Sequence, residues 1–131
     1  MIWFDRYRDP ILAANCALLM MALHFAFVIV MGGNPITPEL YGPAVYVIPA
    51  LVWAGAQMGG ALVSILGVLI DGKLGGLFLA VGSLIQFAFY LYLAVAGSMA
   101  AQGVVVTAGS LWLTAPMAFA CCVAGFGRLM K

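Results

Sequence analysis

The chain has 131 residues, of which 66% are hydrophobic and 7% are charged, with a net charge of +1 at neutral pH. A soluble domain is about 25% charged and about 45–50% apolar, so a chain with a mean hydropathy of +1.19 has too little polar surface to stay in water. This composition excludes a soluble enzyme and a basic nucleic-acid surface, and it predicts an integral membrane protein.

Four apolar runs are long enough to cross a bilayer, which takes about 20 residues at a rise of about 1.5 Å per residue. We therefore predict a single, all-α membrane domain whose four transmembrane helices form two antiparallel hairpins, because short connections join them. The predicted spans are residues 11–31, 44–70, 74–96 and 104–126, after an interfacial segment at residues 1–10.

The first ten residues, MIWFDRYRDP, mix aromatic rings with two arginines and two aspartates. This composition is typical of a segment at the depth of the lipid headgroups. Asp9 followed by Pro10 is a helix-start pattern, since Asp caps a helix and proline suits its first position. We expect the first transmembrane helix to begin there and to end before Gly32.

The second predicted span contains Pro49, which removes a backbone donor and is expected to bend the outer third of that helix. Asp71, Gly72 and Lys73 interrupt the apolar pattern, and the uncharged residues 97–103 separate the last two spans.

All the positive side chains fall on one side of this topology. The opposite side carries only Glu39. Because positive loops are retained in the cytoplasm, we predict that both termini are cytoplasmic and that the membrane is a bacterial-type inner membrane. The five positive residues are Arg6, Arg8, Lys73, Arg128 and Lys131.

Three polar residues fall near the centres of the later spans: Gln57, Gln86 and Thr114. Gln57 and Gln86 lie 15 and 14 residues from Gly72, so an antiparallel pair of helices brings them level. A side-chain amide in hydrocarbon seeks a partner, and the simplest interpretation is a contact between the two glutamines.

Small residues share the helix faces of both glutamines. Gly60 and Ser64 follow Gln57, and Gly82 and Ser83 precede Gln86. Close packing of the two helices is one interpretation, and a polar lining of a pore or substrate cavity is the other. The last span carries a similar stripe of small or polar residues, which packs helices or lines a pore: Thr107, Ser110, Thr114, Ala118, Cys121 and Gly125.

The only histidine, His24, shares a helix face with Cys16 and Met20, while Met117 and Cys121 are four residues apart in the last span. Thiolate, thioether and imidazole ligands suit Cu(I), so these five residues are candidate metal ligands. The alternative is that methionine and cysteine only fill space and that His24 bonds to a neighbouring carbonyl or glutamine. We expect no cofactor.

The predicted spans contain no Asp, Glu, Lys or Arg, which argues against a proton- or cation-coupled transporter. No nucleophile with its base, phosphate-binding loop or metal-ligand motif is present, so no enzymatic activity is predicted. The sequence favours a small membrane scaffold or accessory subunit that packs with itself or with a larger membrane complex. The alternatives are an oligomeric, holin-like pore-former and a Cu(I)-handling membrane protein.

Overall fold

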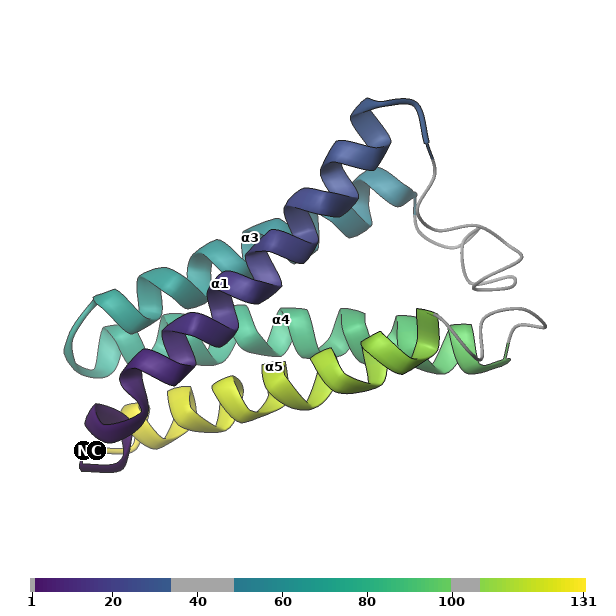
Figure 1. Ribbon diagram of the computed structural model, residues 1–131. Coiled ribbons are helices and arrows are strands. Elements are labelled where there is room, and N and C mark those ends of the chain that lie inside the picture. The colour runs from purple at the N-terminus through teal and green to yellow at the C-terminus, as the bar shows by residue number, and fades with distance from the viewer. Residues whose placement is uncertain (1, 34–48, 100–106) are drawn as a thin grey trace.

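The computed structural model describes residues 2–33, 49–99 and 107–131, which form α-helices and their connecting turns. Figure 1 shows the helices as two neighbouring pairs that diverge from one end of the molecule toward the other. The helices in the described ranges are α1 (Ile2–Val30), α3 (Ala50–Leu69), α4 (Gly72–Met99) and α5 (Thr107–Leu129).

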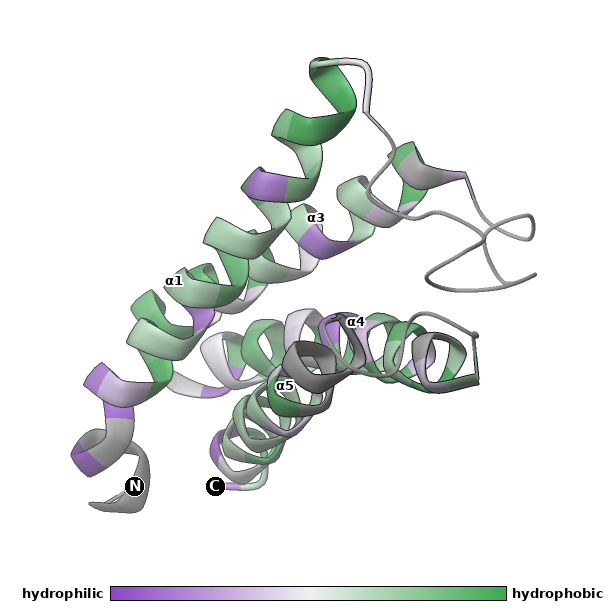
Figure 2. Ribbon diagram, turned by 45° about the vertical axis from the view of Figure 1, so that its right-hand side comes forward, coloured by the Kyte–Doolittle hydropathy of each residue, from purple (hydrophilic) through white to green (hydrophobic). Residues whose placement is uncertain are grey.

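Three helices are long and apolar enough to cross a membrane, over Arg8–Val30, Leu51–Leu69 and Gly72–Ala96. Figure 2 shows that hydrophobic residues run along most of their length. Large apolar side chains also point outward, such as Leu51, which is 72% exposed. Such a surface is stable against lipid tails rather than water, and it is the surface of a membrane protein.

The fourth predicted span is described in part. Helix α5 has an apolar stretch over Leu113–Leu129, which is shorter than the stretches in the other helices. Residues 104–106, where that span was predicted to begin, lie outside the described residues. The helix runs past the predicted end at residue 126 as far as Leu129.

Helix α1 begins earlier than the sequence predicted. It starts at Ile2 and contains Pro10 in its interior, so the prediction that Pro10 takes the first helical position is wrong. A proline inside a helix gives up one backbone hydrogen bond, here to the carbonyl of Arg6. That loss is small beside the backbone hydrogen bonds that the other residues of the segment gain by continuing the helix. The residues predicted as a separate interfacial segment therefore form the first turns of α1.

Pro49 precedes α3 instead of bending it. Its backbone is extended, with φ −60° and ψ 147°, and the helix starts at the next residue. The Pro49 carbonyl accepts hydrogen bonds from the amides of Val52 and Trp53, at 3.0 and 3.2 Å. Proline has no amide hydrogen to donate, so it suits the position just before Ala50, where the helix begins. The predicted residues 44–48 of this span lie outside the described residues.

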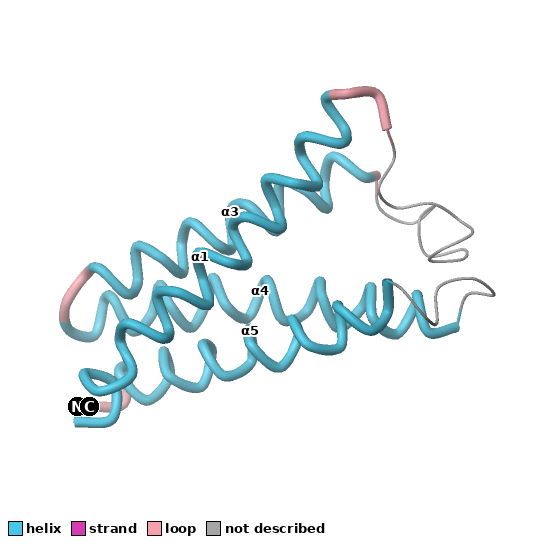
Figure 3. Tube along the Cα trace, in the orientation of Figure 1, coloured by secondary structure: helices cyan, strands magenta, loops and turns pink. Residues whose placement is uncertain are grey.

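A short turn joins α3 to α4, and Figure 3 shows it as a loop at one end of the helices. Ile70 ends α3 in an extended conformation, and Gly72 has a φ of +77°, which residues with a Cβ rarely adopt. At its other end α4 continues to Met99, three residues beyond the predicted limit. There the Ser98 hydroxyl donates a hydrogen bond of 2.8 Å to the carbonyl of Ala94, so its donor is paired within the same helix.

Helix α4 packs between α3 and α5, while α1 packs mainly on α3 and at fewer points on α5. Gly60 of α3 lies beside Gln86 of α4. Seven residues later in α3, Gly67 lies beside Leu79, seven residues earlier in α4, so these helices are antiparallel.

Two apolar clusters form the core. The larger one joins all four helices and contains Leu18, Trp53, Tyr90, Leu93, Ala94, Ala115 and Ala118. The other lies nearer the chain ends and contains Ile11, Val68, Leu79, Cys121 and Ala124.

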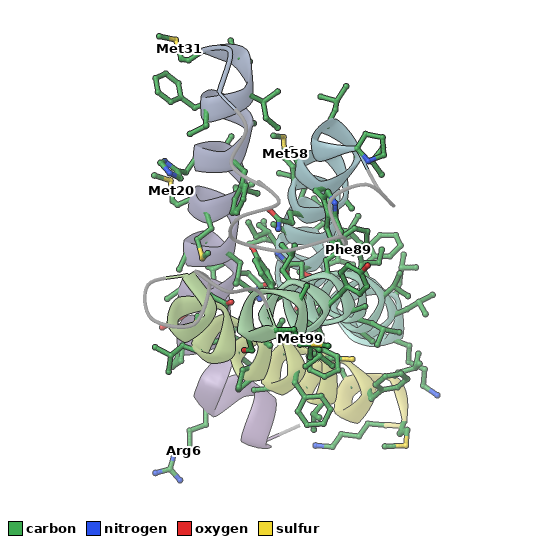
Figure 4. All side chains as sticks on the ribbon, turned by 90° about the vertical axis from the view of Figure 1, so that its right-hand side faces the viewer. Arg6, Met20, Met31, Met58, Phe89 and Met99 are labelled. Carbon is green, nitrogen blue, oxygen red and sulfur yellow. The ribbon has the colours of Figure 1, made fainter. Side chains whose placement is uncertain are left out.

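The start of α1, the turn between α3 and α4, and the end of α5 lie at the same end of the molecule (Figures 1 and 3). The positive side chains described there belong to Arg6, Arg8, Lys73, Arg128 and Lys131. Figure 4 shows Arg6 extending away from the helices at this end.

Candidate functional site

The seam between α3 and α4 is built from small residues that let the two backbones approach. A Cβ added to Gly82 would lie 2.5 Å from the Ser64 hydroxyl and 2.6 Å from the Gly60 carbonyl. The hydroxyls of Ser64 and Ser83 are 3.1 Å apart and share a hydrogen bond. These four residues, which the sequence singled out, therefore lie together in one buried contact.

Gln57 and Gln86 are both fully buried near this seam. The predicted hydrogen bond between them is absent, because none of their four amide nitrogen and oxygen atoms has a partner among the described residues. The helix register explains the difference. With Ser64 opposite Ser83, Gln86 falls opposite Ala61, about one helical turn from Gln57.

Tyr90 is a third buried polar residue near Gln57 and Gln86, and the sequence analysis missed it. Its side chain is 0% exposed, and its hydroxyl has no hydrogen-bond partner in the described part of the chain. Tyr90 follows Gln86 by four residues and so shares its helix face. That spacing is the signal that could have identified it.

Thr114 is buried, with 8% of its side chain exposed. Further along the predicted stripe of α5, a Cβ on Gly125 would contact the backbone of Ala80 in α4. The stripe thus faces the protein's own helices at these positions. Thr107 and Ser110 lie in the first turns of α5, and their side chains are outside what the structure describes.

Asn15 is a second polar residue that the sequence analysis did not consider. It is fully buried in α1. Its Nδ2 donates to the carbonyl of Ile11 at 2.9 Å and approaches the Sγ of Cys121 at 3.5 Å. A buried asparagine thereby fixes α1 against α5.

The candidate copper ligands do not share a face. Cys16, Met20 and His24 are exposed on α1, whereas Cys121 is buried against Asn15. Met117 of α5 is partly buried. Within residues 2–33, 49–99 and 107–131, no group of three His, Cys, Asp or Glu side chains could hold a metal ion.

The exposed side of α1 is a continuous surface, which we name the outer face of α1. Figure 4 shows Met20 and Met31 pointing away from the other helices. His24 makes no hydrogen bond to the parts of the chain that are described, so the predicted bond to a carbonyl or glutamine is not present there. The outer face comprises Cys16, Met20, His24, Phe27 and Met31, all exposed.

Arg128 is a third residue whose role the sequence did not reveal. Placed by sequence in a short tail after the last span, it lies in the last turn of α5. Its guanidinium reaches the C-terminal end of α3, where it donates to the carbonyls of Gly67 and Ile70.

Comparison with known proteins gives no further constraint: no protein-family model, no curated protein and no solved structure matches this chain.

Proposed function

We propose that this chain is a small, non-catalytic integral membrane scaffold or accessory subunit that packs against a second copy of itself or against a larger membrane assembly. The outer face of α1 carries the proposal. In an apolar 18-residue stretch of α1 only 17% of the residues are buried, against 44% in the corresponding stretches of α3 and of α4. A protein partner packed along α1 would raise the buried fraction of this helix to a value similar to that of α3 and α4.

His24 makes lipid an unfavourable neighbour for this face. It lies six residues before Val30, about 9 Å from the end of the span. Ionisable side chains at such depths usually face other protein, because hydrocarbon offers no hydrogen bonds. A neighbouring helix with a polar side chain at this depth would stabilise the exposed imidazole.

The proposed orientation places both termini in the cytoplasm of a bacterial-type inner membrane, with the helices as two antiparallel hairpins. The gathering of all five positive side chains at one end of the molecule supports it, since positive segments are retained on the cytoplasmic side.

A pore lined by Gln57, Gln86 and Thr114 has less support, because all three side chains are buried within one chain. Copies could line a pore with them only if the helices rotated out of their present contacts. Copper handling has less support as well, because Cys121 faces Asn15 while Cys16 and His24 point outward.

Photo-crosslinking in native membranes tests the proposal. A photoreactive amino acid at Met20, which is 66% exposed on the outer face of α1, should give protein adducts. The same group at Leu84, which is 49% exposed on α4, is the matched control and should react mainly with lipid. The mass of the Met20 adduct distinguishes a second copy from another subunit. Lipid adducts alone at Met20 would rule out the scaffold.

A further inference from the structure

The contact region of the four helices contains buried polar atoms that have no hydrogen-bond partner in the described part of the protein. Gln57, Gln86 and Tyr90 are each 0% exposed. Both amide atoms of each glutamine and the hydroxyl of Tyr90 lack a hydrogen-bond partner among the described residues. Buried polar groups in proteins are almost always paired with protein or with ordered water.

The register of the seam brings these three side chains to one place. Ser64 lies opposite Ser83, so Gln57, seven residues earlier, falls opposite Tyr90, seven residues later. Gln86 is one turn away from Tyr90 on the same face of α4. Trp53 and Tyr90 belong to one core cluster with residues of α1 and α5, and Gln57 and Gln86 are fully buried as well.

The chemistry of the group selects an uncharged ligand that both donates and accepts hydrogen bonds. The amide nitrogens donate, the amide oxygens accept, and the phenol does either. The predicted spans place no Asp, Glu, Lys or Arg near this depth, so nothing there would compensate a charged ligand.

The close packing of the seam selects a small ligand. A Cβ on Gly60 would lie 2.9 Å from the Cγ of Gln86 and 3.0 Å from the Gly82 carbonyl, which leaves little free space beside the glutamine. Gln57 and Gln86 are offset by about one turn, or about 5.4 Å along the helix axis. Two hydrogen bonds of about 2.8 Å through one bridging molecule span that offset.

We propose that Gln57, Gln86 and Tyr90 bind a small cluster of ordered water in the interior of the membrane domain. A buried water molecule makes about three hydrogen bonds, so about two water molecules satisfy the five orphaned atoms. The cluster bridges α3 and α4 at the depth where direct contact between the glutamines is not made. It does not depend on the proposed packing of a partner against α1.

Solid-state NMR of the full chain in liposomes, with magnetisation transferred from water, tests the proposal. The Nε2 signals of Gln57 and Gln86 are assigned by their loss in Gln57→Leu and Gln86→Leu. The backbone amide of Ala61, which is 0% exposed and lies in the same contact between α3 and α4, is the internal control. The two Nε2 signals should appear at short mixing times, at which the Ala61 amide has not yet received magnetisation from water. Build-up at Gln57 and Gln86 no faster than at Ala61 would overturn the proposal.

A conservative variant keeps the test valid if the leucine variants do not fold. Tyr90→Phe preserves the ring and removes the hydroxyl, so it should slow the transfer of water magnetisation to the side-chain amides of glutamine, which needs no assignment from the leucine variants. Tyr92→Phe is the matched control, because Tyr92 is 40% exposed on the same helix; it should leave the transfer unchanged. Equal effects of the two variants would show that the Tyr90 hydroxyl holds no water.

Discussion

The guanidinium of Arg128 in α5 donates a hydrogen bond of 2.7 Å to the backbone carbonyl of Gly67 in α3, and a second of 2.8 Å to the carbonyl of Ile70. The last carbonyls of a helix lack partners within the helix and carry partial negative charge. The planar fork of arginine donates to two acceptors at once. The Arg128 side chain thus caps the C-terminal carbonyls of α3 and connects this helix to α5.

Replacing Arg128 by methionine should lower the free energy of unfolding by about 2 kcal/mol, since hydrogen bonds to a charged group contribute about 1.5–3 kcal/mol. Arg128→Lys should lose about half as much, because an ammonium does not form the planar fork. Thermal unfolding in mild detergent, followed by tryptophan fluorescence, measures both. Lys131→Met, at an exposed residue, is the control; an equal loss there would contradict the prediction.

Gly67→Ala should destabilise the protein by about 1–3 kcal/mol through overpacking, because its Cβ would overlap the backbone of Leu79. Gly59→Ala in the same helix meets nothing within 4 Å, so it should stabilise by about 0.5–1 kcal/mol. The same unfolding measurement compares them. If both variants shift stability in the same direction, the close contact of α3 with α4 is not as described.

Ser64 and Ser83 should show coupling in a double-mutant cycle. Hydrogen bonds between membrane helices contribute on average about 0.6 kcal/mol and at most about 2 kcal/mol. The double variant Ser64→Ala with Ser83→Ala should therefore lose less free energy of unfolding than the sum of the losses in the two single variants. Ser64→Ala with Ser98→Ala is the control and should be additive, since the Ser98 hydroxyl bonds within its own helix. Additivity in both pairs would exclude the hydrogen bond across the seam.

Induced expression should leave the membrane potential of the host cell unchanged, because the polar side chains that would line a pore are buried within the chain. Thr114→Leu should therefore have no effect on permeability. A potential-sensitive dye and a DNA-binding dye that intact membranes exclude provide the readout. Prompt entry of the second dye, abolished by Thr114→Leu, would favour the pore-former instead.

Reporter fusions test the proposed topology. A reporter before residue 1 and one after residue 131 should both be active in the cytoplasm, and one inserted at Glu39 should lie on the opposite side. Reporters at the two ends found in different compartments would exclude an even number of crossings and with it the proposed orientation.

The sequence predicted the helical membrane class because apolar length alone decides it. Same-face spacing also indicated that Gly60 and Ser64 would pack near Gly82 and Ser83, since side chains three or four residues apart share a helix face. These features depend on local pattern.

The remaining features depend on how the helices dock. Nearly equal residue counts from Gly72 predicted Gln57 level with Gln86, but the register of the small residues places Tyr90 opposite Gln57. No local pattern showed that Arg128 would reach carbonyls in another helix, or that Cys16 would be exposed while Cys121 is buried. The position of Pro10 was mispredicted because an Asp-Pro pair, which is typical of helix starts, also occurs inside a helix at the cost of one backbone hydrogen bond.

The bonds from Arg128 to α3 also order events during synthesis. Ile70 precedes Arg128 by 58 residues, so the ribosome must translate all of α4 and most of α5 before the end of α3 is closed. Until then, the carbonyls of Gly67 and Ile70 lack the hydrogen bonds that Arg128 donates to them. Until Arg128 has been made, α3 is held against α4 only by the contacts between those two helices, such as the hydrogen bond between Ser64 and Ser83.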